Sequence, residues 1–228
     1  MSDWSDHFKQ SNRSLFQQAI NNRILVEQII NETPKEGSIL EAGCGTAYLS
    51  CLLADMNFKV TAGDIDEDVL SDAARRYSVP HNPVKFLKAD LFKLDEQFTN
   101  DNFDTICHSG VLEHFSDEMI VETLKQQKTI AKKVVFKIPN SKTKMSASHF
   151  GDERFLKNSK WVDLIAKAGF STIKVVGGES TPKLSYLLPY VFMTYPKIGR
   201  SHFVNKIAKI GAIYRKLFSR HTIFICGR

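Results

Sequence analysis

Cysteine is scarce in this sequence, and long apolar runs are absent. The 228 residues hold four cysteines, at positions 44, 51, 107 and 226, and no two have the CxxC spacing. This disfavours a zinc site and predicts a reduced, cytoplasmic protein. No run of 18 apolar residues occurs, which disfavours a membrane-spanning helix. The polar N-terminal stretch MSDWSDHFKQ lacks the apolar segment of an export signal, so we expect no export.

Negative charge is also absent from one part of the sequence. Residues 180–228 contain no Asp or Glu, but they carry nine Lys and Arg side chains. Subtracting these nine from the formal net charge of +6 leaves −3 for residues 1–179. The basic character of the protein therefore belongs to its C-terminal fifth, where it bears on possible partners.

Short β-rich runs alternate with helical patterns along most of the chain. This alternation is typical of an α/β fold whose mostly parallel sheet has helices on both faces. Helical spacing before residue 37 predicts one or two N-terminal helices. The expected strands are 38–42, 59–64, 84–89, 103–108, 132–138, 171–177 and 221–227. The expected helices between them are 46–55, 66–77, 116–130 and 158–168.

The stretch ILEAGCGTAYLS, residues 39–50, joins the first strand to a helix through small residues. Small residues let a ligand approach the backbone, and a helix N-terminus offers free N–H groups. A dinucleotide fingerprint would need a last glycine at position 48, which is Tyr48. Glu41 would repel a pyrophosphate and suits a positively charged group. An NAD(P)-dependent oxidoreductase is therefore the weaker reading, and no Tyr-x-x-x-Lys pair is placed to support it.

The run from Glu41 to Ala47 resembles the E/DxGxGxG motif of class I methyltransferases that use S-adenosylmethionine, with Ala47 replacing the third glycine. The resemblance continues in order through VTAGDID, VKFLKADLFKL, FDTICHSGVLEHF, KKVVFKIPN and WVDLIAKAGF, over about 37–177. Within the class, the chain is similar to small-molecule enzymes such as the ubiquinone-biosynthesis O-methyltransferases. The resemblance implies a Rossmann-like sheet of seven strands whose last strand is antiparallel.

The resemblance also implies a cofactor site for S-adenosylmethionine. Glu41 would face the amino group of its methionine moiety, Asp64 the ribose and Asp90 the adenine amino group. The alternative for Asp64 and Asp90 is that each caps the helix that follows it. Asp66 or Asp68 is expected to open helix 66–77. The full set of expected cofactor residues is Glu41, Gly43, Cys44, Gly45, Asp64, Ile65, Asp90, Leu91 and His108.

Three histidines are candidates for a general base: His108, His114 and His149. Glu113 and His114 match part of a Glu-x-x-Glu-His run that has been linked to a metal in the ubiquinone-biosynthesis enzymes. Gly110 replaces its first acid, so we expect no metal site and interpret Glu113-His114 as support for the turn. His149 lies in the loop SHFGDERF, whose Asp152, Glu153 and Arg154 are alternatively surface ion pairs.

A basic, aromatic insertion at 178–220 separates the sixth and seventh expected strands. Apolar residues recur at helical spacing in it, at Phe203, Ile207, Ile210, Tyr214 and Leu217. Three interpretations stay open: a lid over the acceptor, a peripheral contact with a membrane surface, and binding of nucleic acid. They are favoured in that order. Nucleic-acid binding is the least favoured, because no base-methylating motif or RNA-binding module is recognisable.

These observations predict one methyltransferase domain over 1–228. It comprises N-terminal helices at 1–36, a cofactor-binding core at 37–177, the insertion at 178–220 and a final strand at 221–228. The expected function is methyl transfer from S-adenosylmethionine to a small or lipid-like acceptor, on O, N or C, in the cytoplasm or at a membrane surface. The main alternative is a protein that binds the cofactor without catalysis.

Overall fold

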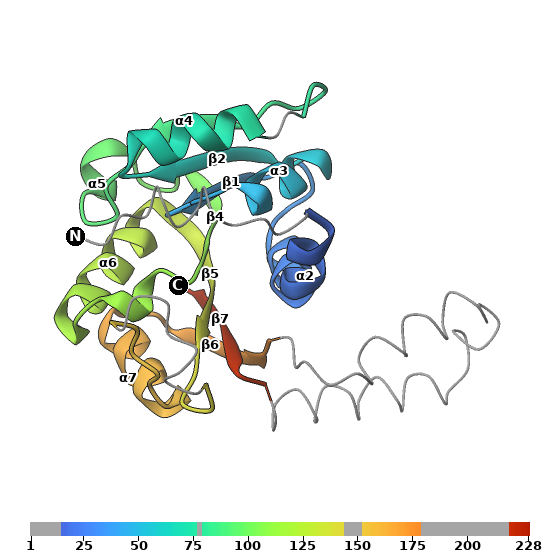
Figure 1. The fold of residues 1–228 in the computed structure, drawn as a ribbon. Helices are drawn as coiled ribbons and strands as arrows, with labels where there is room; N and C mark the ends of the chain where they lie inside the picture. Colours follow the sequence, from blue (N-terminus) through green and yellow to red (C-terminus); the bar gives the residue numbers. More distant parts are fainter. Residues whose placement is uncertain (1–14, 77–78, 144–151, 179–218) are drawn as a thin grey trace.

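Seven strands form one sheet in a computed structural model, which describes residues 15–76, 79–143, 152–178 and 219–228 (Figure 1). The strand order is β3-β2-β1-β4-β5-β7-β6, and β7 alone runs antiparallel to its neighbours. The predicted fold class is confirmed. The strands are β1 (Ser38–Ala42), β2 (Lys59–Asp64), β3 (Lys85–Lys88), β4 (Phe103–Ser109), β5 (Ala131–Pro139), β6 (Thr172–Gly177) and β7 (His221–Gly227).

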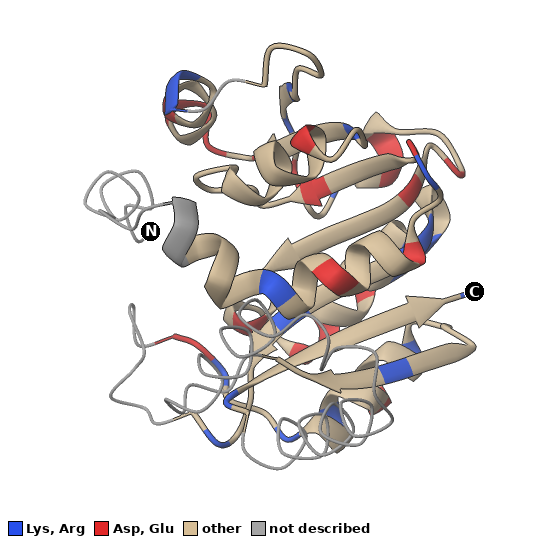
Figure 2. Ribbon diagram, turned by 90° about the vertical axis from the view of Figure 1, so that its right-hand side faces the viewer, with Lys and Arg blue, Asp and Glu red and all other residues tan. Residues whose placement is uncertain are grey.

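Helices cover both faces of the sheet. Two of them, α2 (Leu15–Glu32) and α3 (Tyr48–Asp55), pack on one face, with α4 (Glu67–Arg76) beside β2 and β3. Figure 2 shows α2 crossing this face of the sheet. The other face carries α5 (Leu94–Gln97), the 3-10 turn η1 (Leu112–His114), α6 (Asp117–Ile130) and α7 (Asn158–Lys167). The sequence did not predict α5, because four residues are too few to show a helical period.

The central strands are buried on both sides, which explains their continuous apolar sequences. Successive side chains point to opposite faces of a strand. Leu40, Ile106 and Val134 therefore join the core under α6 and α7, whereas Ile39 and Val135 join the core under α2 and α3. All five side chains are fully buried. The two larger cores thus lie between the sheet and the helices on its two faces.

The antiparallel strand β7 fills the slot between β5 and β6 and pairs with both. The prediction that residues 221–227 return beside the sixth strand is confirmed. Gly178 N donates a hydrogen bond to His221 O at 3.0 Å, so the two ends of the insertion meet at the C-terminal ends of the parallel strands. The insertion itself, with the lid, membrane and nucleic-acid interpretations, lies outside the described residues for 179–218.

Two expectations from composition are checked by the described residues. All four cysteines are unpaired and buried there. Among the helices of the described part, none combines the length and apolar character needed to cross a bilayer.

Candidate active site

The loop between β1 and α3 lies at the C-terminal edge of the sheet and is built on left-handed backbone. Gly43 has φ +73° and Gly45 has φ +50°. The N–H groups of Gly43 and Cys44 both donate to Gly63 O, at 2.8 and 3.0 Å, which fixes this cofactor turn (residues 43–47) to β2. Glycine is favoured at such positions because it has no Cβ to clash. The backbone of the turn is thereby left open, so that a ligand can approach it closely.

Ala47, the residue that replaces the third glycine, is also left-handed, with φ 53°. This conformation costs an L-residue about 1–2 kcal/mol. The methyl group of Ala47 is fully buried against α4, and this burial offsets roughly 0.8 kcal/mol of that cost. The turn therefore keeps its shape without the third glycine.

Gly43 provides the first test of the turn. A Cβ built at Gly43 would lie 2.9 Å from Cγ2 of Val111, and the residue would also bear left-handed strain. We expect Gly43→Ala to lower stability by about 1–2 kcal/mol and to weaken S-adenosylmethionine binding about tenfold. Calorimetry with the cofactor and urea unfolding measure the two effects.

The matched control for this change is Gly169→Ala. Gly169 has φ +87° but follows α7, at the opposite edge of the sheet. It should lose stability while keeping cofactor affinity. If both variants bound the cofactor as tightly as the original chain, the turn would not be part of the binding site.

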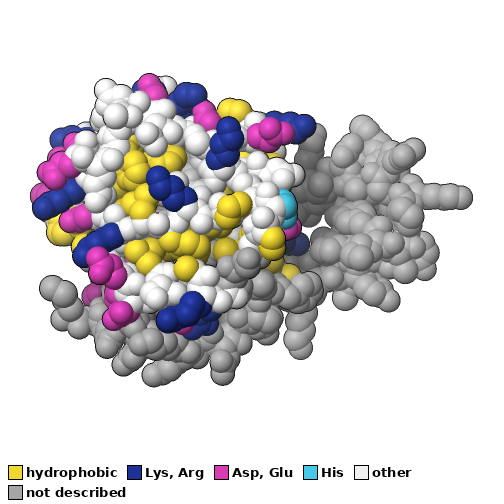
Figure 3. All heavy atoms as spheres, turned by 90° about the horizontal axis from the view of Figure 1, so that it is seen from above, with side chains coloured by type: hydrophobic (Ala, Val, Ile, Leu, Met, Phe, Trp, Pro, Cys, Tyr) yellow, Lys and Arg dark blue, Asp and Glu magenta, His cyan; other side chains and the backbone are white. Residues whose placement is uncertain are grey.

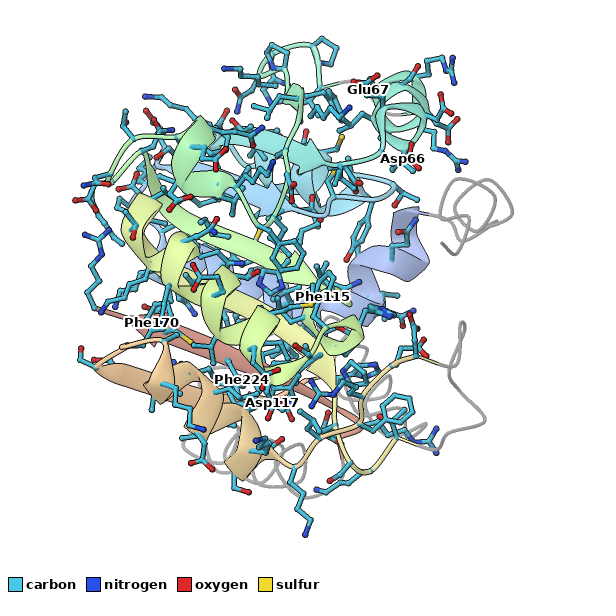
Figure 4. The ribbon with its side chains drawn as sticks, turned by 90° about the vertical axis from the view of Figure 1, so that its left-hand side faces the viewer. Asp66, Glu67, Phe115, Asp117, Phe170 and Phe224 are labelled. Carbon is cyan, nitrogen blue, oxygen red and sulfur yellow. The ribbon has the colours of Figure 1, made fainter. Side chains whose placement is uncertain are left out.

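Asp64 ends β2 and reaches back to the cofactor turn. Its Oδ2 accepts from Gly45 N at 3.0 Å, and its Oδ1 accepts from Asp66 N at 3.2 Å. Burial raises the pKa of this carboxyl, opposed by those backbone hydrogen bonds. Asp66 is the residue that opens α4, since its Oδ1 accepts from Asp68 N and Val69 N (Figure 4). The cap predicted for Asp66 or Asp68 is therefore confirmed at Asp66.

Asp90 and Ile65 lie beside Asp64 at the same edge. Ala89 N donates to Asp64 O, which joins the ends of β2 and β3, and Asp90 Oδ1 accepts from Phe92 N at 2.9 Å. The face in Figure 3 exposes several groups of hydrophobic side chains. Ile65 is the most exposed large hydrophobic residue of the described part, at 59%. This arrangement would fit an adenosine that lies between Asp64 and Asp90 and contacts the apolar side chain of Ile65. Leu91 is partly buried and packs against the core under α6, and its contact with a cofactor stays a prediction.

Glu41 points into the protein rather than out of the turn. Its side chain is buried, and Oε2 accepts from Ser50 N at 2.9 Å and from Ser50 Oγ at 2.5 Å. Burial raises the pKa of Glu41 to about 8, against the effect of both Ser50 hydrogen bonds, and the nearby Asp64 adds to the rise. The contact of Glu41 with a cofactor amino group stays a prediction.

The raised pKa of Glu41 makes stability depend on pH. Below about pH 4.5, the pKa of Glu41 in the unfolded chain, its carboxyl group is neutral in both the folded and the unfolded state. It then does not lower the free energy of unfolding. As pH rises towards 8, the unfolded chain ionises first, so the folded state loses relative stability. The new side chain in Glu41→Gln cannot ionise. Compared with the original chain, this variant should have a free energy of unfolding that is higher by on the order of 2 kcal/mol at pH 8 but little changed at pH 5.

Urea unfolding of the ligand-free chain at both pH values measures this difference. The control is Glu96→Gln, which removes an exposed acid. An equal gain for Glu41→Gln at pH 5 and pH 8 would contradict the assignment.

His108 does not lie in the candidate site. Its side chain is fully buried and stacks on Phe136, with ring centroids 5.0 Å apart. Burial lowers its pKa to about 3, and Gln127 opposes this only in part, although neither ring nitrogen reaches hydrogen-bond geometry within the described residues. A neutral, inaccessible imidazole does not fit the predicted roles of base and of lining for the methionine end. This corrects the expectation for His108.

His114 lies on η1, the turn that also carries Val111 against Gly43. Its side chain is 11% exposed, and its Nδ1 lies 2.9 Å from Asp152 Oδ1. Glu113 beside it is 3% exposed, and its Oε2 has no hydrogen-bond partner within the described residues. Burial, followed by the charges of Glu153 and Asp152, raises the pKa of Glu113 to about 8. His149 lies outside the described residues.

Arg154 ties the loop after β5 to the start of α6. Its guanidinium donates to Phe115 O and to Asp117 Oδ1, both at 2.5 Å, and Lys160 also pairs with Asp117 (Figure 4). The alternative of ion pairs for this loop is therefore right for Arg154, although its partner is Asp117. Sequence reasoning missed the contacts Glu41–Ser50, Gly43–Val111 and His114–Asp152, because each joins segments that carry no shared motif.

Comparisons with known proteins agree with this geometry. Residues 39–133 match a family described as a methyltransferase domain. A malonyl-[acyl-carrier protein] O-methyltransferase of Paenibacillus sp. (strain JDR-2) is 27% identical over 214 residues, which cover 86% of this chain and 76% of the relative.

Two solved structures share the fold. A SAM dependent methyltransferase from Archaeoglobus fulgidus has a TM-score of 0.67 at 16% identity, with full coverage of both chains. Magnesium protoporphyrin IX methyltransferase from Synechocystis PCC 6803 with bound SAH has a TM-score of 0.62 at 16% identity, covering 99% of this chain and 93% of the other. Together, the domain match over residues 39–133 and the strand order identify a methyltransferase domain with the fold of class I methyltransferases, and S-adenosylmethionine is the cofactor that the ordered motifs predict.

Proposed function

We propose that this enzyme methylates an oxygen atom of a small or lipid-like acceptor. The observation that carries the proposal is the similarity to the malonyl-[acyl-carrier protein] O-methyltransferase, which extends over most of both chains. The apolar, aromatic composition of residues 184–196 supports an acceptor with an apolar part. A cytoplasmic location, with peripheral membrane contact through 180–220, belongs to the same proposal.

The residues at the edges of β1, β2 and β3 would hold the cofactor. The backbone of Gly43 and Gly45 would take the methionine end, Asp64 the ribose hydroxyls and Asp90 the adenine amino group, with Ile65 against the ring. When bound, S-adenosylmethionine supplies an electrophilic methyl group on a sulfonium centre. The protein's own task is then to hold the acceptor oxygen in line, since proximity and orientation supply most of the rate.

The turn η1 is the described part of the chain best placed to position an acceptor. Val111 contacts the cofactor turn at Gly43, and His114 follows three residues later with its ring partly exposed. His114 is thus the one of the three candidate histidines that the described residues leave accessible near this turn. We do not require a base, because an acceptor carboxylate reaches the methyl group already ionised.

Turnover assays test the proposal directly. The chain is incubated with S-adenosylmethionine and either an acyl thioester bearing a free carboxylate, a fatty acid, or a polar amine, and S-adenosylhomocysteine is measured. Turnover with one of the carboxylates, and none with the amine, is the expected result. Turnover with the amine alone would overturn the acceptor class, and cofactor binding without turnover on any acceptor would favour the non-catalytic alternative.

A further inference from the structure

We propose that Arg154 is a positioning residue, which couples the loop after β5 to the cofactor site through the turn η1. The two ends of η1 contact two different parts of that site. At its start, Val111 lies so close to the cofactor turn that a Cβ built at Gly43 would be 2.9 Å from Val111 Cγ2. At its end, the ring of Phe115 meets the ring of Phe92 edge-on, with centroids 4.9 Å apart. A ligand that fixes either part of the site therefore also acts on η1.

Phe92 belongs to the loop after β3, which also carries Asp90, the acid expected at the adenine. Phe92 N donates to Asp90 Oδ1 at 2.9 Å. Gln126 of α6 holds the same loop, because its Nε2 donates to Phe92 O at 2.8 Å and its Oε1 accepts from Leu94 N at 2.9 Å. Since α6 begins two residues after Phe115, η1 and α6 together hold the loop after β3 at two separate contacts.

Arg154 makes three hydrogen bonds to the end of η1 and the start of α6. Its backbone N–H donates to Glu113 O at 2.9 Å, and its guanidinium donates to Phe115 O and to Asp117 Oδ1, both at 2.5 Å (Figure 4). Its own carbonyl accepts from Leu156 N at 3.0 Å, which extends the attachment along the loop after β5. This loop is therefore fastened to the turn that contacts the cofactor site at both ends.

The planar guanidinium of Arg154 is suited to this link. A guanidinium donates in two fixed directions at once, whereas an ammonium group is a point charge. Lys160 of α7 also pairs with Asp117, at 2.5 Å, but within the described residues its side chain has no bond to η1. Hydrogen bonds from Lys160 and then from Arg154 lower the pKa of Asp117, so this acid stays ionised at neutral pH. Arg154 thus differs from Lys160 by its bond to Phe115 O.

The coupling has to act in both directions. A ligand that fixes the cofactor turn and the loop after β3 favours the same arrangement of η1 that Arg154 holds. By linkage, the factor by which the ligand stabilises the Arg154 contacts equals the factor by which those contacts strengthen ligand binding. This role of Arg154 rests on the cofactor placement given under the proposed function, at the edges of β1, β2 and β3, but it does not depend on the acceptor.

Hydrogen exchange of the full chain, with and without saturating S-adenosylhomocysteine, tests the coupling. We expect the ligand to slow exchange of the amides of residues 152–157 at least about fivefold, the lower end of couplings between protein sites. Calorimetry should show that Arg154→Ala weakens ligand binding by a similar factor and removes the protection. Arg154→Lys should resemble Arg154→Ala, because a lysine can keep the ion pair with Asp117 but not the second bond to Phe115 O.

The matched control is Lys160→Ala, which removes the other cation bound to Asp117. It should keep both the ligand affinity and the protection of residues 152–157. Phe92→Leu removes the ring contact with Phe115 and leaves the bonds of Arg154 in place, so it should also reduce the protection. Circular dichroism checks that each variant is folded.

Two results would overturn the coupling. One is binding of S-adenosylhomocysteine that leaves exchange at residues 152–157 unchanged. The other is an equal effect of Arg154→Ala and Lys160→Ala, which would mean that Arg154 only stabilises the start of α6. Failure of the original chain to bind S-adenosylhomocysteine at all would instead refute the cofactor placement, and the coupling with it.

Discussion

A chain in which a short turn replaces residues 179–218 should still bind S-adenosylmethionine but methylate no acceptor. The replaced segment begins after β6 and ends before β7, at one side of the sheet, whereas Asp64 and Asp90 lie at the ends of β2 and β3, at the other. Asp64 and Asp90 are therefore separated from it by β1, β4 and β5. If the segment covers the acceptor, its removal abolishes transfer and leaves the cofactor site intact.

The structure shows where to join the ends. Gly178 N already donates to His221 O, so an Asn-Gly pair inserted between Gly178 and Ser219 would close a four-residue loop between Gly178 and His221 and connect β6 to β7. Ser219 and Arg220 should be kept, because Asn140 binds the backbone of both. Calorimetry with S-adenosylmethionine and an assay for S-adenosylhomocysteine give the two readouts. A folded variant that has lost cofactor binding would place residues 179–218 in the cofactor site instead.

Vesicle co-sedimentation of the full chain then separates the interpretations of this segment. Binding to anionic vesicles that decreases with salt, and no binding to neutral vesicles, would support the membrane contact. Absence of binding to either kind of vesicle would exclude the membrane contact and leave the lid, with nucleic-acid binding as the less favoured interpretation of the segment.

Asp64→Ala should weaken S-adenosylmethionine binding by roughly 10- to 150-fold, whereas Asp66→Ala should change it less than threefold. A hydrogen bond to a charged group contributes about 1.5–3 kcal/mol, and Asp64 would accept from ribose hydroxyls as well as from Gly45 N. Asp66 caps α4, so its loss should cost about 1 kcal/mol of folding stability instead.

The two aspartates are good mutual controls, because they are two residues apart and carry the same charge. Calorimetry gives the affinities, and urea unfolding gives the stabilities. Equal losses of affinity would mean that the ribose acid has been misassigned. A loss of stability but not of affinity in Asp64→Ala would mean that Asp64 serves only to hold Gly45.

The strands were predictable because each is a short β-rich run bounded by turn residues. Bounds for β1, β2 and β7 agree with the prediction, whereas the cofactor roles of Asp64 and Asp90, which the family resemblance implies, stay predictions. The position of β7 between β5 and β6 follows from long-range pairing rather than from local sequence. The burial of His108 was foreseeable in part, since it shares a face of β4 with Ile106, which is fully buried.

Glu41 and Asp152 show what local sequence does not contain. Glu41 is nine residues from Ser50, and its inward orientation depends on how α3 packs on β1. Asp152 is 38 residues from His114, and only the return of the chain after β5 brings them together. Motifs predict the edge of the sheet at which a ligand would bind, but the partners of each side chain come from packing.

Because β7 lies between β5 and β6, the sheet can be completed only after β7 has been synthesised. The ribosome delivers β6 well before β7, yet β6 reaches the sheet only by pairing with β7. The nascent chain therefore carries β5 with one unpaired edge, and β6 without a neighbour, until residues 221–227 emerge. Strand edges of this kind pair with other chains when they stay exposed, so the interval before β7 docks is when this protein is most open to aggregation.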